Sequence, residues 1–144
     1  MPVSRAMRRL QQVLEIQESE CMAAMEAARA ELAQLEQALT RGTARERGGR
    51  LLVAASATTG EVVDRIAGIE ETRTARRLAA ALEPRIAEAQ AVLDAMRQEF
   101  LSKRIERRQA ETLMEEAEAA DKVEAERRAQ KNLDDWFLSR RDPA

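Results

Sequence analysis

Residues 21–39 read CMAAMEAARAELAQLEQAL, and the pattern in this stretch decides the fold. Small or apolar residues recur there at alternating spacings of four and three, at Cys21, Met25, Ala28, Leu32, Leu35 and Leu39. This alternation keeps one residue from each turn on the same face and is the seam of a left-handed coiled coil. The stretch therefore predicts a long helix that packs along its seam against a second helix.

One of the two seam series continues towards the N-terminus. At seven-residue spacing it runs through Met7, Leu14, Cys21, Ala28 and Leu35. Ser4 is suited to cap the start of a helix, so a first helix is expected over about 4–41. The second series is polar in this half, with Gln11 and Glu18 at seam positions, so the seam is weaker there.

Composition supports the same conclusion. Of the 144 residues, 35% are charged and only 2% are aromatic, which is typical of long helices and coiled coils. Basic and acidic residues, 24 and 26 in number, nearly cancel. No signal peptide is recognisable, the longest apolar run (residues 51–57) is too short to cross a bilayer, and Cys21 is the only cysteine. These features predict a cytoplasmic protein.

Glycines interrupt the pattern over about 42–60. Gly42, Gly48 and Gly49 each cost a helix interior about 1 kcal/mol relative to Ala. Residues 58–60 read TTG and offer a second break. The tip of a hairpin is expected in this window.

A second helix is expected over about 61–140, ended by Asp142-Pro143. Pro84 predicts a kink or a short break within it. Pairing Glu18 with Lys103, two polar seam positions, places the tip near Gly60 and leaves the chain beyond about residue 117 without a partner helix. This register also brings Leu39 near Leu82. The prediction is an all-α, two-helix antiparallel coiled-coil hairpin with a longer second helix, forming one domain over 1–144.

The residues favour a non-enzymatic role without cofactor or metal. The sequence has no His and no glycine-rich phosphate loop. The carboxylates of Glu115, Glu116 and Glu118 fit a solvated helix face better than a metal site. Cys21 is interpreted as a packed seam residue, with a redox role as the alternative.

Two groups of residues are candidates for partner binding. Arg5, Arg8 and Arg9 form a basic cluster that fits either solvation or docking to an acidic partner. Near the C-terminus, Trp136, Phe137 and Leu138 are adjacent and cannot all face one seam, and Trp is favoured at interface hot spots. The alternative is that Trp136 and Leu133 fold back on Met7 and Leu10.

Both ends of the chain resemble the FliJ family of flagellar export proteins and its YscO-type relatives in injectisomes. Residues 10–18 (LQQVLEIQE) are similar to the family's opening "L-x-x-V-L-x-h-R-E" helix, although Gln17 replaces the usual basic residue. Residues 128–135 (RAQKNLDD) are similar to its "R-x-E/Q-K-x-L-D-E" ending. The glycine-rich insert, Pro84 and the Trp136-Phe137 pair depart from the family.

The resemblance implies a stalk or adaptor that inserts its paired ends into the hexameric export ATPase. It also implies contacts with the cytoplasmic domain of the export gate, through the second helix before or near Pro84, and with export chaperones. Membrane association would then be peripheral, through the export apparatus. The resulting partner-binding residues are Arg5, Arg8, Arg9, Arg128, Gln130, Lys131, Leu133, Asp134, Asp135, Trp136 and Phe137.

A generic homodimeric coiled-coil scaffold is the alternative function. No nucleic acid is expected as a partner, because basic and acidic residues are interleaved and no aromatic stacking platform accompanies the basic ones. No small-molecule substrate is expected either.

Overall fold

The computed structural model describes residues 5–141, and all of these except Gly60 and Glu61 lie in two α-helices. α1 spans Arg5–Thr59 and α2 spans Val62–Arg141. The described residues contain no strand, which confirms an all-α fold of two helices. The second helix is the longer, with 80 residues against 55. The predicted cap at Ser4 and the predicted end at Asp142-Pro143 lie outside the described residues.

The chain divides into two compact units, and each helix contributes to both. Unit 1 consists of Met1–Glu20 and Phe100–Ala144, and unit 2 consists of Cys21–Glu99. The expectation of one domain over 1–144 stays a prediction.

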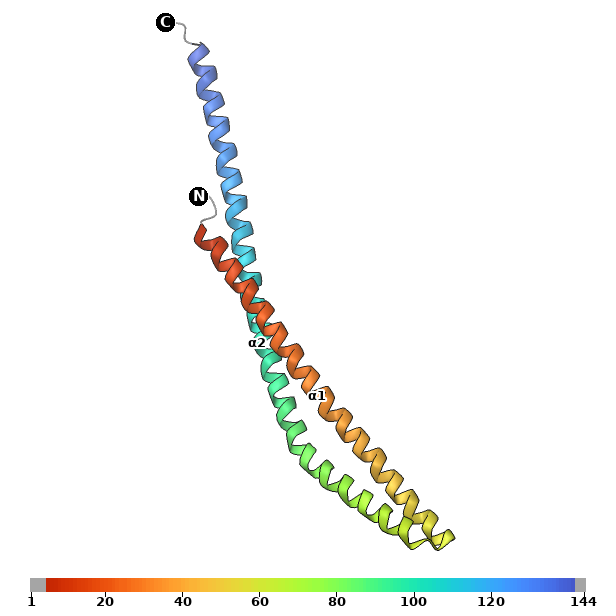
Figure 1. Ribbon diagram of the computed structural model, residues 1–144. Helices are drawn as coiled ribbons and strands as arrows, with labels where there is room; N and C mark the ends of the chain where they lie inside the picture. The colour runs from red at the N-terminus through yellow and green to blue at the C-terminus, as the bar shows by residue number, and fades with distance from the viewer. Residues whose placement is uncertain (1–4, 142–144) are drawn as a thin grey trace. The chain divides into compact units, whose positions relative to one another are not determined.

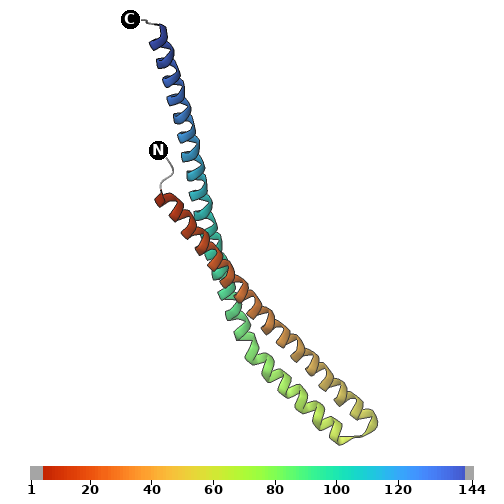
Figure 2. The same ribbon diagram turned by 45° about the horizontal axis from the view of Figure 1, so that its top comes forward.

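The turn of the hairpin lies in unit 2, at Gly60. Gly60 has a φ of +72°, a conformation that favours glycine because it has no Cβ. Its amide donates to the Ser56 carbonyl at 2.8 Å and so satisfies a carbonyl at the end of α1. Figures 1 and 2 both show α1 and α2 lying side by side as they leave this turn. The tip of the hairpin therefore lies at Gly60, as predicted.

The predicted end of the first helix near Arg41 is wrong, because α1 continues through the glycines to Thr59. The reason is a close approach of the two helices. A Cβ on Gly49 would lie 2.8 Å from the Gly68 carbonyl oxygen and 2.6 Å from Thr72 Oγ1. A Cβ on Gly68 would lie 2.6 Å from the Gly49 carbonyl oxygen. At Gly49 the close helix–helix contact that glycine permits offsets its lower helix propensity of about 1 kcal/mol, whereas Gly42 and Gly48 make no such contact.

The core of unit 2 follows seven-residue spacing on both helices. On α1 the buried residues at this spacing are Ala28, Leu35, Gly42, Gly49 and Ser56, and on α2 they are Gly68, Ala75, Leu82 and Ala89. Leu35, Leu82 and Ala89 form the central cluster, against which Leu39 and Ile86 pack. Leu39 thus lies near Leu82, as predicted. The glycines continue the series that starts at Met7 and do not interrupt it.

Contacts in unit 2 pair later residues of α1 with earlier residues of α2. Arg45 contacts Glu71 at 2.7 Å, and Gly42 lies opposite Leu78. α2 is continuous through Pro84, so the short break considered there does not form.

Unit 1 contains the start of α1 and the second half of α2. Met7, Leu10 and Leu14 face the stretch of α2 from Glu106 to Met114, within which Ala110 is buried. The Glu18 carboxylate accepts a hydrogen bond from Arg107, so the predicted pairing of Glu18 with Lys103 is wrong by one helical turn.

Candidate partner-binding surface

The last part of α2 has no helix packed against it in unit 1. We define residues 122–141 as the C-terminal segment, and every one of them is exposed. Figures 1 and 2 show this segment continuing beyond the start of α1. The last half-buried residue before it is Asp121. The side chains of the C-terminal segment are therefore available to a partner.

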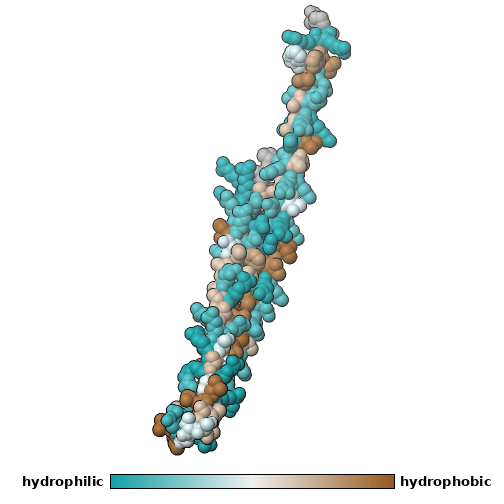
Figure 3. All heavy atoms as spheres, turned by 90° about the vertical axis from the view of Figure 1, so that its right-hand side faces the viewer, coloured by the Kyte–Doolittle hydropathy of each residue, from teal (hydrophilic) through white to brown (hydrophobic). Residues whose placement is uncertain are grey.

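Large apolar side chains gather in this segment. The exposed fractions are 53% for Leu133, 50% for Trp136, 55% for Phe137 and 64% for Leu138. Figure 3 shows brown, hydrophobic residues among the hydrophilic ones near this end. We call Trp136, Phe137, Leu138 and Arg140 the aromatic cluster.

The aromatic cluster is ordered by contacts among its own members. The rings of Trp136 and Phe137 lie edge to face, with centroids 5.2 Å apart and an interplanar angle of 76°. The Arg140 guanidinium carbon lies 4.5 Å from the centroid of the Trp136 ring. Each such contact contributes about 0.5–1 kcal/mol at an exposed site. The cluster presents a positioned apolar surface with a cation at its edge, which is the composition of an interface hot spot.

The polar candidates of the segment make local contacts along the helix. Arg128 pairs with Glu124 at 2.8 Å, and Gln130 donates to Asp134 at 3.1 Å. Exposed pairs four residues apart contribute only about 0.3–0.5 kcal/mol, so a partner can replace them at little cost. Lys131 and Asp135 are exposed as well.

The N-terminal arginines lie elsewhere in unit 1. Arg5, Arg8 and Arg9 are exposed on the first turns of α1, next to Met7, which faces Met114. Trp136 lies about 20 residues further along α2, or roughly 30 Å at the rise of an α-helix. The structure therefore does not bring the two groups of candidates together into one site.

The alternative in which the aromatic residues fold back on the start of α1 is excluded. Met7 and Leu10 line one pocket together with Gln109 and Leu113, and both Leu133 and Trp136 are half exposed.

A charged pair lies at the seam of unit 1. The side chains of Arg107 and Glu18 are 22% and 16% exposed, and Arg107 also contacts Glu111 at 3.0 Å. The hydrogen bond to Glu18 raises the pKa of the Arg107 guanidinium above its usual value, and this outweighs the opposing effect of partial burial. Lys103, the predicted partner, contacts Glu106 at 3.4 Å instead. Arg107 occupies this position because its planar guanidinium can reach both carboxylates at once.

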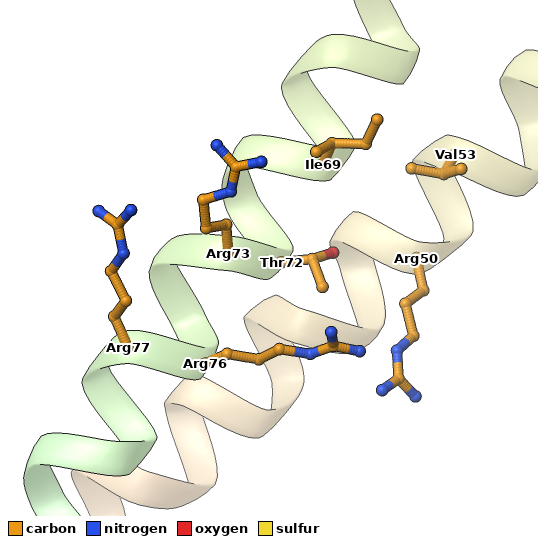
Figure 4. A pocket seen from close by; sticks show the side chains of 7 residues that line it. All are labelled: Arg50, Val53, Ile69, Thr72, Arg73, Arg76 and Arg77. Atoms are coloured by element: carbon orange, nitrogen blue, oxygen red, sulfur yellow. The ribbon is translucent and has the colours of Figure 1, made fainter.

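A groove in unit 2 is a feature that the sequence reasoning missed. We call it the arginine groove: about 500 Å³ in volume, with Val53, Ile69 and Thr72 on its floor and Arg50, Arg73, Arg76 and Arg77 around it (Figure 4). The signal in the sequence is the run of basic residues spaced by three and four on the second helix. These basic residues indicate a groove only if α1 continues past its glycines, because Arg50 and Val53 of α1 form part of the lining.

The remaining features considered are Cys21, a metal site and a membrane-spanning helix. Cys21 is half-buried on the seam series, in agreement with its interpretation as a packing residue. Within residues 5–141, no group of three or more His, Cys, Asp or Glu side chains is arranged to hold a metal ion. The helices of this described range also contain no stretch long and apolar enough to cross a membrane.

Comparison of the chain with protein-family models, with curated proteins and with solved structures gives no match.

Proposed function

We propose that this protein is a non-enzymatic stalk or adaptor of a bacterial type III export apparatus of the flagellar kind. It binds the export ATPase ring through the C-terminal segment, and it also contacts the export gate and export chaperones. It acts in the cytoplasm, at the inner face of the membrane that holds the apparatus. One observation carries the proposal: Trp136 and Phe137 are half exposed on a stretch of helix that α1 does not cover.

The export system is suggested by the resemblance of residues 10–18 and 128–135 to the FliJ family. The second of these stretches lies within the exposed C-terminal segment, next to the aromatic cluster. Motif and exposed apolar surface therefore coincide on the same helix. This coincidence favours partner binding over a purely structural role for the segment.

The proposed architecture is an antiparallel coiled-coil hairpin with a kink at Pro84. Buried positions at seven-residue spacing on both helices support the coiled coil. A kink is expected at Pro84 because proline removes one hydrogen bond of α2 and crowds the preceding turn.

Binding would transfer the aromatic cluster from water into an apolar pocket of the partner. Trp136 and Phe137 each keep about half of their surface exposed in the free chain. Burying the remainder contributes on the order of 2 kcal/mol for each ring. Arg140, already held against Trp136, would add a hydrogen bond or an ion pair to an acidic group of the partner.

The proposal is tested with the purified cognate export ATPase. The chain is expected to bind the ATPase and raise its rate of ATP hydrolysis, and Trp136→Ala with Phe137→Ala is expected to abolish both effects. Leu101→Ala is the matched control, because Leu101 is 49% exposed but lies outside the C-terminal segment. A chain that neither binds nor stimulates the ATPase contradicts the proposal. Sedimentation as a stable homodimer would favour the scaffold alternative instead.

A further inference from the structure

The arginine groove exists because of the close helix approach at Gly49 and Gly68. Val53 Cγ2 lies 2.9 Å from the position that a Gly68 Cβ would take, so Val53 packs directly onto the glycine backbone. The Thr72 hydroxyl donates to the Gly68 carbonyl at 2.8 Å and is satisfied within its own helix. Ile69 is 41% exposed beside these two residues. The floor of the groove is thus apolar, with its one hydroxyl already hydrogen-bonded.

The surroundings of this floor are positively charged. The guanidiniums of Arg50 and Arg76 share one carboxylate, that of Glu46, at 2.7 and 3.0 Å. Arg73 contacts Glu70 at 3.4 Å, with both side chains more than half exposed, and such a pair is weak. Across residues 5–141 no ion pair of Arg77 is found. Four guanidiniums against two carboxylates leave two uncompensated positive charges.

Figure 4 shows how these side chains are arranged. Arg76 reaches from α2 across to α1, while Arg73 and Arg77 extend from α2 on the other side of Ile69 and Thr72. The groove therefore offers an apolar strip between two helices, with cations along its length. A helix that carries apolar residues on one face and carboxylates beside them matches this pattern.

We propose that the arginine groove is a docking site for an acidic amphipathic helix of a partner protein. Apolar residues of the partner helix contact Val53 and Ile69, and its carboxylates pair with Arg73 and Arg77. Arg50 and Arg76, which share Glu46, supply a further net positive charge. This inference rests on side chains of unit 2 and not on the contact with the export ATPase proposed for the C-terminal segment. The groove lies on the part of α2 before Pro84, where the resemblance to the FliJ family places the contact with the export gate.

An anionic lipid surface is the other ligand that combines apolar contact with arginines, and the structure disfavours it. Val62 and Val63, at the hairpin turn, are 66% and 78% exposed, but they lie between Glu61 and Asp64. A side-chain hydrogen bond with Asp64, followed by the charge of Asp64, raises the pKa of Glu61. Two carboxylates at the turn would be repelled by a negatively charged membrane.

The test uses the full chain and a labelled peptide of about four helical turns. The peptide has Leu at helical spacing on one face and Glu on both flanks, and a second peptide has Gln in place of every Glu. Fluorescence anisotropy is expected to show binding of the Glu peptide, weakened by salt, and binding of the Gln peptide weaker by on the order of tenfold or more.

Variants locate the binding site. Arg73→Glu with Arg77→Glu is expected to reduce affinity for the Glu peptide by on the order of tenfold or more. Arg29→Glu with Arg41→Glu changes the net charge equally at exposed positions of unit 2 outside the groove, and it is expected to retain most of the affinity. Ile69→Ser is expected to weaken binding of both peptides. Because Arg73 and Arg77 are exposed, circular dichroism should show the same fold in every arginine variant.

Three results would overturn the proposal. The first is equal affinity for the Glu and Gln peptides. The second is an equal loss of affinity in the Arg29/Arg41 and Arg73/Arg77 variants. The third is binding to vesicles containing phosphatidylglycerol, reduced by the Arg73/Arg77 variant, with no binding of the Glu peptide.

Discussion

Gly48 and Gly49 are adjacent in α1, yet replacing each by Ala should have opposite effects on stability. A Cβ on Gly48 would meet nothing within 4 Å, so the variant gains only the better helix propensity of Ala, about 1 kcal/mol. A Cβ on Gly49 would lie 2.6 Å from Thr72 Oγ1, 2.8 Å from the Gly68 carbonyl oxygen and 3.0 Å from the Thr72 amide nitrogen. Two of these three atoms belong to the backbone of α2, so the helices themselves must move apart.

The gain in propensity is the same at both positions, so the difference between the two variants isolates the cost of crowding. Forcing one extra carbon into a close contact costs about 1–3 kcal/mol. We therefore expect Gly48→Ala to be about 1 kcal/mol more stable than the wild type and about 1–3 kcal/mol more stable than Gly49→Ala. At about 2–4 °C per kcal/mol for a chain near this length, several degrees should separate the two melting temperatures.

Thermal and urea unfolding followed by circular dichroism measure this difference. Gly42→Ala distinguishes the effect of burial from the effect of crowding. Gly42 is buried, but a Cβ added to it would lie 4.0 Å from the nearest atom, Leu78 Cδ2. It should behave like Gly48→Ala. Equal stability of the Gly48 and Gly49 variants would refute the close approach at Gly49 and Gly68, and with it the origin of the arginine groove.

Three further predictions concern the core, the ion pairs and the C-terminal segment. Leu82→Ala should lower the free energy of unfolding in a urea titration by about 2–5 kcal/mol, because Leu82 is 5% exposed in the central cluster. Leu51→Ala is the control and should lower it far less, because Leu51 is 65% exposed. The hydrogen bonds from Arg76 and from Arg45 lower the pKa of Glu46 and of Glu71, respectively, below 4.5. Their contribution to stability is therefore complete above the unfolded-state pKa and is lost as pH falls through the lower folded-state values. Glu46→Gln with Glu71→Gln should lower the melting temperature near neutral pH and should match the wild type in strong acid, and a constant difference across the pH range would contradict these ion pairs. A chain ending at Asp121 should keep the melting temperature of the full chain, because residues 122–141 are exposed, and a large drop would show that the segment packs within the fold.

The helical class and the tip could be predicted because they depend on local signals. The seam from Cys21 to Leu39 determines the period, and Thr59-Gly60 supplies the cap and the left-handed residue that end α1. The end of the first helix could not be predicted in the same way. Propensity alone argues against three glycines in a helix. The contact that offsets this cost at Gly49 involves Gly68, which lies on the other helix.

The candidate binding residues were predictable in part. The adjacency of Trp136, Phe137 and Leu138 predicts that at least one of them is exposed, since one helix face cannot bury all three. In the structure all three are exposed. The partner of Glu18 was not predictable, because Lys103 and Arg107 are both basic and lie one turn apart on the same face. Only the ability of Arg107 to reach Glu111 as well as Glu18 distinguishes them. The arginine groove could not be predicted, because it combines side chains from both helices and therefore depends on how the helices pair.

The fluorescence of Trp136 tests the central claim most directly, since it is the only Trp of a chain without Tyr. In the free protein its emission should be that of an indole half exposed to water, because the side chain is 50% exposed. Titration with the cognate export ATPase, carrying Phe at its own Trp positions, should shift this emission to shorter wavelength and shield it from an aqueous quencher. Binding of the ATPase with no change in Trp136 emission or quenching would contradict the claim that the C-terminal segment is the docking surface.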